Sequence, residues 1–295
     1  MSSTIIRNIL VPVDFSETSL NALETALTIA RRHQSTVQIL HVIDNTFDFT
    51  LAGDGYNTSS NFLDNSSDIL QALAGSIYQK HQIMPAVISE EGHVSNCIVK
   101  NAITQKADLM VMGTHGASGI REGFIGSNAY GVIKHASCPV LTIPPKKKWG
   151  DFKRVLFPVK PISSALSRYE FVRELIARTN CSLEVLGLSC SRSGNDAEVI
   201  AEMIDEFKDT LAADKVHVST KYNYGKNVAD DVLKTAAGLK ADLIVLTPLV
   251  DVTNKHFFVG PNTQRIVNYA RVPVLSVRRI TTPSVTGMAS KSISF

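Results

Sequence analysis

Residues 107–127 read ADLMVMGTHGASGIREGFIGS, an apolar run that leads into a glycine-rich loop. Residues 108–112 predict a buried parallel strand, and residues 128–135 predict a short helix. Between them Gly113, Gly116, Gly126 and Ser127 follow the spacing G-x2-G-x9-G-S. Glycines let a backbone approach a ligand closely, and the start of a helix offers unpaired N–H groups to an anion. The stretch therefore suggests a phosphate-binding loop.

The chain repeats this segment with most of its glycines replaced. ADLIVLTPLV at 241–250 matches ADLMVMGTHG at 107–116 with an offset of 134 residues. Earlier in the chain, VLFPVK at 155–160 matches ILVPVD at 9–14 with an offset of 146. The fall from 146 to 134 places about twelve extra residues in the first half, and we assign much of the excess to a loop at 44–60. For a chain of 295 residues we predict domains at 1–147 and 148–280, followed by a flexible tail at 281–295.

Hydrophobic periodicity predicts the same alternation of strands and helices in both halves. In the first half strands are expected at 5–13, 37–43, 84–89, 108–112 and 140–143, with helices after Ser16 and at 62–81, 94–104 and 128–135. In the second half strands are expected at 154–159, 183–188, 216–221, 242–246 and 274–277, with helices at 164–178, 197–213, 228–237 and 262–270. Helical crossovers between strands favour an α/β fold of two tandem doubly wound domains, each an open five-stranded parallel sheet with helices on both faces.

Composition is that of an ordinary globular protein, with 44% hydrophobic residues, 19% charged residues and a net charge of +3. This small charge gives no indication of nucleic-acid binding. No segment has the ~18–20 consecutive apolar residues of a membrane span, and the first residues lack the pattern of a secretory signal, so a cytoplasmic protein is expected. The cysteines have no metal-ligand or CxxC spacing and are expected to be free thiols: Cys97, Cys138, Cys181 and Cys190.

Ligands of open parallel sheets bind beyond the carboxyl ends of the strands, where the strand order reverses. Asp14 ends the first predicted strand, Val42 lies at the end of the second, and the glycine loop follows the fourth. Asp14 could accept a hydrogen bond from a hydroxyl or amine, Val42 could pack against a flat apolar ring, and the loop with Ser127 could hold phosphates. Together these residues indicate a nucleotide site.

Histidine and arginine side chains near this site have more than one interpretation. His115 and Arg121 lie inside the glycine loop and could contact a phosphate or simply face solvent. His41 is either a ligand or a neighbour in the core.

These features resemble the universal stress protein family over nearly the whole chain. The resemblance is carried by VPVD at 11–14, LHV at 40–42, the G-x2-G-x9-G-S loop and KHASCPVL at 134–141. In the ATP-binding branch of that family, the first-strand Asp and second-strand Val flank adenosine, while the loop holds the phosphates. The resemblance implies ATP, with Mg²⁺ as a candidate companion ion, bound by Pro12, Val13, Asp14, Val42, Met112, Gly113, Gly116, Gly126, Ser127 and Asn128. The alternative is that the glycines only end a strand and turn a loop.

The second half departs from the motif. Lys160 stands where the first half has Asp14, Thr247 and Val250 replace the two leading glycines, and Pro261 replaces the serine. Side chains at 247 and 250 would obstruct phosphate, and proline has no N–H donor. The second half is therefore expected to have lost ATP and to serve as a packing partner or to bind another ligand.

The sequence favours binding over catalysis. It lacks GxxxxGK[ST], lacks the SGGxDS loop of ATP-splitting adenylating enzymes, and shows no Ser-His-Asp or metal-ligand spacing. A slow ATPase or phosphotransferase and a nucleotide-free scaffold remain the alternatives. The resemblance also implies that strands 140–143 and 274–277 pair edge to edge within one chain as a pseudo-dimer, and it leaves a homodimer open.

Overall fold

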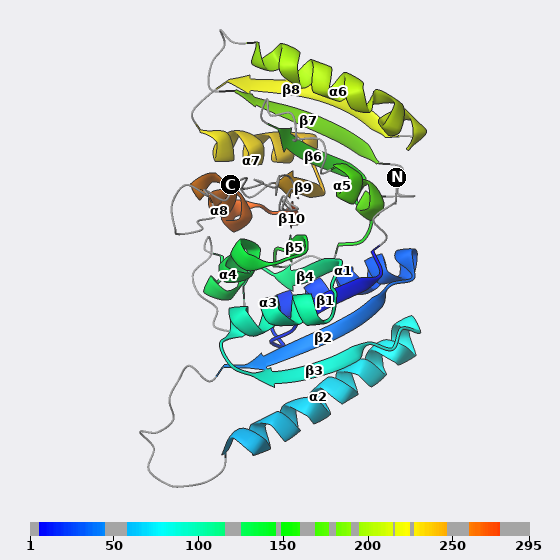
Figure 1. The fold of residues 1–295 in the computed structure, drawn as a ribbon, viewed down its shortest axis with the longest axis vertical. Coiled ribbons are helices and arrows are strands. Elements are labelled where there is room, and N and C mark those ends of the chain that lie inside the picture. The colour runs from blue at the N-terminus through cyan, green and yellow to red at the C-terminus, as the bar shows by residue number, and fades with distance from the viewer. Residues whose placement is uncertain are drawn as a thin grey trace, which may run out of the picture.

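A computed structural model of the chain describes residues 6–44, 58–115, 125–145, 149–159, 169–176, 181–189, 195–214, 216–224, 227–246 and 260–277. Strands and helices alternate along both halves (Figure 1). The first half contains β1 (Asn8–Pro12), α1 (Glu17–His33), β2 (Thr36–Ile43), α2 (Thr58–His81), β3 (Ala86–Glu91), α3 (Val94–Thr104), β4 (Leu109–Gly113), α4 (Ser127–His135) and β5 (Val140–Ile143). The second half contains β6 (Arg154–Val159), α5 (Tyr169–Ile176), β7 (Ser182–Ser189), α6 (Asp196–Ala213), β8 (His217–Tyr224), α7 (Val228–Leu239), β9 (Leu243–Leu246), α8 (Pro261–Tyr269) and β10 (Val274–Ser276).

The ten strands in the described part of the chain form one sheet in the order β3-β2-β1-β4-β5-β10-β9-β6-β7-β8. The order within each half is the same, and neighbouring strands within a half are parallel. The two halves meet at an antiparallel seam in which β5 pairs with β10 and Leu141 lies opposite Leu275. The expected α/β fold, its five strands per half and the pairing of the last strands are therefore confirmed. Figure 1 shows the sheet running along the molecule from β3 to β8.

Two hydrophobic clusters cover the faces of this sheet. Alternation along β1 separates them, because Ile9 and Val11 face one cluster while Leu10 faces the other. Helices α1, α2, α5 and α6 pack on the first face, and α3, α4, α7 and α8 pack on the second. Each cluster includes residues from both halves, so the core continues across the seam.

The start of α1 agrees with its expected cap. The Ser16 hydroxyl accepts a 3.2 Å hydrogen bond from the Ser19 backbone N–H, and Ser16 has an extended backbone. At the other end of α1, Arg32 reaches into the second half. Its guanidinium lies 2.6 Å from the Asp151 carboxylate and donates a 3.1 Å hydrogen bond to the Leu175 carbonyl.

Several predicted boundaries were wrong. The strand expected at 84–89 is Ala86–Glu91, because Met84 is 62% exposed and stands outside the ladder with β2. Helix α2 begins at Thr58, inside the predicted loop. Strand β8 continues to Tyr224 because it pairs with β7 along its whole length. Residues 45–57, most of that loop, lie outside the described residues, as do the tail at 281–295 and both flanks of α5.

Cysteines in the described part of the chain are buried and free, namely Cys97, Cys138 and Cys181. Burial raises the pKa of Cys138 and of Cys181 to about 12, which keeps both as neutral thiols near neutral pH. The expectation of free thiols is confirmed for these three, and Cys190 lies outside the described residues. None of the described helices has the length and apolar character needed to cross a membrane.

Candidate functional site

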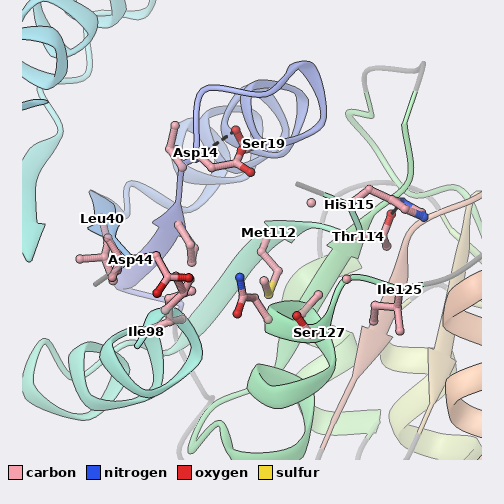
Figure 2. Close-up of a pocket in the computed structure, with 18 residues that line it drawn as sticks. Asp14, Ser19, Leu40, Asp44, Ile98, Met112, Thr114, His115, Ile125 and Ser127 are labelled. Carbon is pink, nitrogen blue, oxygen red and sulfur yellow. Dashed lines mark hydrogen bonds between the residues drawn. The ribbon is translucent and has the colours of Figure 1, made fainter. Parts of the chain in front are cut away.

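The strand order of the first half reverses between β1 and β4, since β1 pairs with β2 on one side and with β4 on the other. A cavity of about 470 Å³ opens beyond the carboxyl ends of these strands (Figure 2). Its volume lies within the range of roughly 300–1,000 Å³ typical of small-molecule sites. The predicted site residues that line it are Pro12, Val13, Asp14, Val42, Met112, Gly113, Gly126, Ser127 and Asn128. Gly116 lies outside the described residues.

One wall of the cavity is apolar. Leu40 and Val42 come from the end of β2, Val94 and Ile98 from α3, and Met112 from β4. Figure 2 shows Leu40 and Ile98 on one side, with Met112 near the centre. Such a wall suits a flat ring. Sequence reasoning missed the contribution of α3, because the helical period does not show which turn faces the strand ends.

Acidic side chains mark the next part of the rim. The Asp14 carboxylate accepts hydrogen bonds from the backbone N–H and the hydroxyl of Ser16, at 3.1 and 2.6 Å. The Asp14 N–H donates to the Ser19 hydroxyl at 3.3 Å (Figure 2). Asp44, which sequence reasoning missed, lines the cavity from the residue after β2. Like Asp14, it is an acidic residue within two positions of the end of a strand, and this pattern could have identified it.

Phe15 and His41 support this rim from outside the cavity. Phe15 has φ of 62°, a left-handed conformation that a bulky side chain seldom adopts. Its ring contacts the His41 imidazole, with centroids 4.9 Å apart, and His41 Nδ1 lies 2.7 Å from the Val13 carbonyl oxygen. His41 is therefore a neighbour that supports the end of β1, and it does not line the cavity.

The start of α4 closes the opposite end of the cavity. Gly126 is the N-cap residue and has no side chain to cap the helix, and the first turn of α4 holds no acidic residue. The Gly126 N–H donates a 3.0 Å hydrogen bond to the Thr114 carbonyl, which aligns the helix start with β4. Ser127 and Asn128 line the cavity from the first turn. Free N–H groups and the helix dipole favour an anion here.

Gly113 lines the cavity and also has a packing role that was not expected. A Cβ at this position would lie 2.8 Å from Thr18 Cγ2 and 3.2 Å from the Thr18 carbonyl carbon. The missing side chain therefore lets the end of β4 pack against α1. Close packing of the fold accounts for this glycine before any ligand is considered.

Gly113→Ala should consequently destabilise the protein by about 1–3 kcal/mol, because the buried Thr18 must shift to admit the methyl group. Gly75→Ala is the matched control. Gly75 lies within α2 with open space at its Cβ position, so alanine should stabilise the protein by about 0.5–1 kcal/mol. Urea unfolding measures both changes. A Gly113→Ala variant as stable as the wild type would contradict this packing role.

His115 lines the cavity, yet its imidazole is engaged locally. Its Nδ1 lies 2.8 Å from the Thr114 hydroxyl, and Figure 2 shows the ring extending away from Asp14, Met112 and Ser127. Its Nε2 is buried without a hydrogen-bond partner among the described residues. Arg121, the other candidate within the loop, lies outside the described residues.

The second half repeats the backbone conformation at the N-cap of α4 with altered chemistry. Gly260 caps α8 with φ and ψ of −54° and 147°, close to the −57° and 145° of Gly126. Pro261 follows where α4 has Ser127, so α8 begins with one N–H donor fewer. Lys160, Thr247 and Val250 lie outside the described residues.

Comparison with known proteins matches the model of the universal stress protein family to residues 6–144. Universal stress protein MJ0531 of Methanocaldococcus jannaschii is 32% identical over 154 residues, covering 50% of this chain and 91% of that protein. Universal stress protein Sll1654 of Synechocystis sp. is 28% identical over 140 residues, covering 47% and 85%. A solved universal stress protein from Archaeoglobus fulgidus superposes with a TM-score of 0.73 at 20% identity, covering 94% of this chain and 97% of that one. This last likeness shows the same fold across both halves.

Proposed function

The chain belongs to the universal stress protein family, and we propose that it is a tandem member that binds ATP in its first half and serves a regulatory role in the stress response. Its second half would be a packing partner that has lost ATP. The observation that carries the proposal is a single cavity that combines an apolar wall, an acidic rim and an uncapped helix start.

The chemistry of the cavity suggests how ATP would lie. The adenine would pack against Val42 and Ile98, where the wall is apolar. Asp14 and Asp44 would accept hydrogen bonds from ribose hydroxyls or the adenine amine. The phosphates would reach the first turn of α4, because this end of the cavity offers N–H groups and the Ser127 hydroxyl.

Magnesium fits this arrangement as an ion held mainly by the nucleotide. The described residues contain no cluster of three or more His, Cys, Asp or Glu side chains suited to a metal. Mg²⁺ commonly keeps several waters and binds through phosphates and one or two carboxylates. When present it would neutralise phosphate charge near α4, with Asp14 or Asp44 as the carboxylates within the same cavity.

Isothermal titration calorimetry of the purified protein tests this function with ATP, AMP and adenosine. We expect one site per chain and tighter binding as phosphates are added, because only the phosphates reach α4. The mass of any nucleotide that copurifies provides a second measurement. Absence of binding at millimolar ATP would overturn the proposal and favour the scaffold alternative.

A single-turnover assay separates binding from catalysis. We expect bound ATP to persist, since the sequence lacks the GxxxxGK[ST] and SGGxDS motifs of enzymes that split ATP. Hydrolysis well above the spontaneous rate would instead identify an ATPase. Gly113→Ala is a poor negative control for that assay, because the substitution disturbs packing against Thr18.

A further inference from the structure

A side chain of the second half bonds the backbone of the first-half site. The Asn268 side-chain oxygen, from α8, accepts a 2.7 Å hydrogen bond from the Ile125 backbone N–H, 143 residues earlier in the chain. Ile125 lines the cavity and immediately precedes the N-cap residue Gly126. Figure 1 shows α4 and α8 stacked on one face of the sheet across the β5–β10 seam, which brings the two segments together.

Two successive residues before α4 are thus anchored from different directions. Gly126 donates to the Thr114 carbonyl at the end of β4, within the same half. Ile125 donates to Asn268, across the seam. The two bonds together set where the first N–H groups of α4 point. If only one of these two hydrogen bonds were present, the segment before α4 could rotate about that bond.

Asn268 lies on a helix that is anchored in the core. It is half-buried, and the preceding residues Ile266 and Val267 are buried in the core cluster beneath α8. The offset of 134 residues between the halves makes Lys134 of α4 its counterpart. A lysine ammonium carries only donors and cannot accept an N–H bond. Of these two matched residues, only Asn268 of the second half can therefore supply a side-chain acceptor.

We propose that Asn268 is a positioning residue through which the second half completes the phosphate end of the first-half site. This inference rests on the proposed function, because it takes the start of α4 as the place where phosphate binds. It gives the second half a role in nucleotide affinity even though its own loop has lost the motif.

Asn268→Ala tests the inference in the full-length protein, with Asn262→Ala as the control. Asn262 lies near the start of the same helix and is exposed, and alanine suits a helix at both positions. Titrations with ATP and with adenosine would be compared, together with amide hydrogen exchange of the segment that contains Ile125. Adenosine lacks phosphates and so reports on the rest of the cavity.

We expect Asn268→Ala to weaken ATP about five-fold, which corresponds to about 1 kcal/mol, the usual net value of one hydrogen bond. Adenosine affinity and the Asn262→Ala variant should remain at wild-type values, and the Ile125 amide should exchange faster. Unchanged ATP affinity, or equal losses for ATP and adenosine, would overturn the inference. Failure of the wild type to bind ATP would defeat the proposed function itself. The exchange measurement would still decide whether Asn268 holds the loop, and an unchanged Ile125 rate would show that it does not.

Discussion

Ser127→Asp is expected to lower ATP affinity at least 100-fold while leaving the fold intact. Ser127 is exposed at the first position of α4 and lines the cavity. A carboxylate there would face the phosphates, and two like charges about 4 Å apart repel by about 4 kcal/mol near a protein surface. The same carboxylate favours the helix, since a negative charge in the first turn is worth about 0.3–1 kcal/mol. Binding and stability should therefore change in opposite directions.

Calorimetry with ATP and adenosine measures the first effect, and thermal unfolding measures the second. Ser127→Asn is the matched control, because it is similar in size to Asp and carries no charge. We expect Asn to cost ATP affinity no more than about five-fold, the value of one hydrogen bond, and adenosine to bind both variants equally. Equal ATP affinity of the Asp and Asn variants would show that the phosphates lie away from α4.

Much of the fold could be predicted because its signals are local. The bounds of α3, β5 and β6 match the predicted ranges, because spaced apolar residues mark the helix and short apolar runs mark the two strands. The two internal matches also predicted the repeated strand order. The predicted start of β3 was wrong because Met84 is apolar yet exposed. The predicted end of β8 was wrong because pairing with β7 extends the strand beyond its apolar residues.

The sequence predicted the site residues that lie near strand ends and at the start of α4, and it missed residues contributed by other helices. Asp14, Val42 and Ser127 follow directly from topology, and the structure brings them to one cavity. The contributions of Ile98 and Asn268 depend on how helices pack against other segments, which periodicity does not determine. Gly113 shows the converse problem, because its place in a ligand motif concealed a packing requirement against Thr18.

Asp108 and Asp242 occupy matching positions in the two halves, and their substitution is expected to have the second large effect, a loss of stability. Asp108 accepts hydrogen bonds from the backbone N–H groups of Arg7 and Asn8, both at 2.9 Å. At the matching position of the second half, Asp242 accepts from the N–H groups of Lys153 and Arg154, at 3.0 and 2.9 Å. Each carboxylate therefore binds two N–H groups at the start of the central strand of its half, β1 or β6.

Asp108→Ala and Asp242→Ala should each lower the free energy of unfolding by about 2–3 kcal/mol, because hydrogen bonds to a charged group contribute about 1.5–3 kcal/mol and these are partly solvated. Asp→Asn at either position keeps an acceptor and should lose less than half as much. Urea unfolding of the single variants and of the double alanine variant measures these changes. Strand spacing puts β1 and β6 about 24 Å apart, so the two losses should add.

Because the core clusters run through both halves, both substitutions should shift one common unfolding transition. Two separate transitions, each sensitive to only one aspartate, would instead show that the halves unfold independently. Neither aspartate lines the cavity, so ATP affinity should be unchanged in both Asn variants. This separation explains why the match between 107–112 and 241–246 is close while positions 113, 116 and 127 differ. The shared residues build the sheet that both halves need, whereas Ser127 lines a cavity that, in our proposal, holds ATP only in the first half.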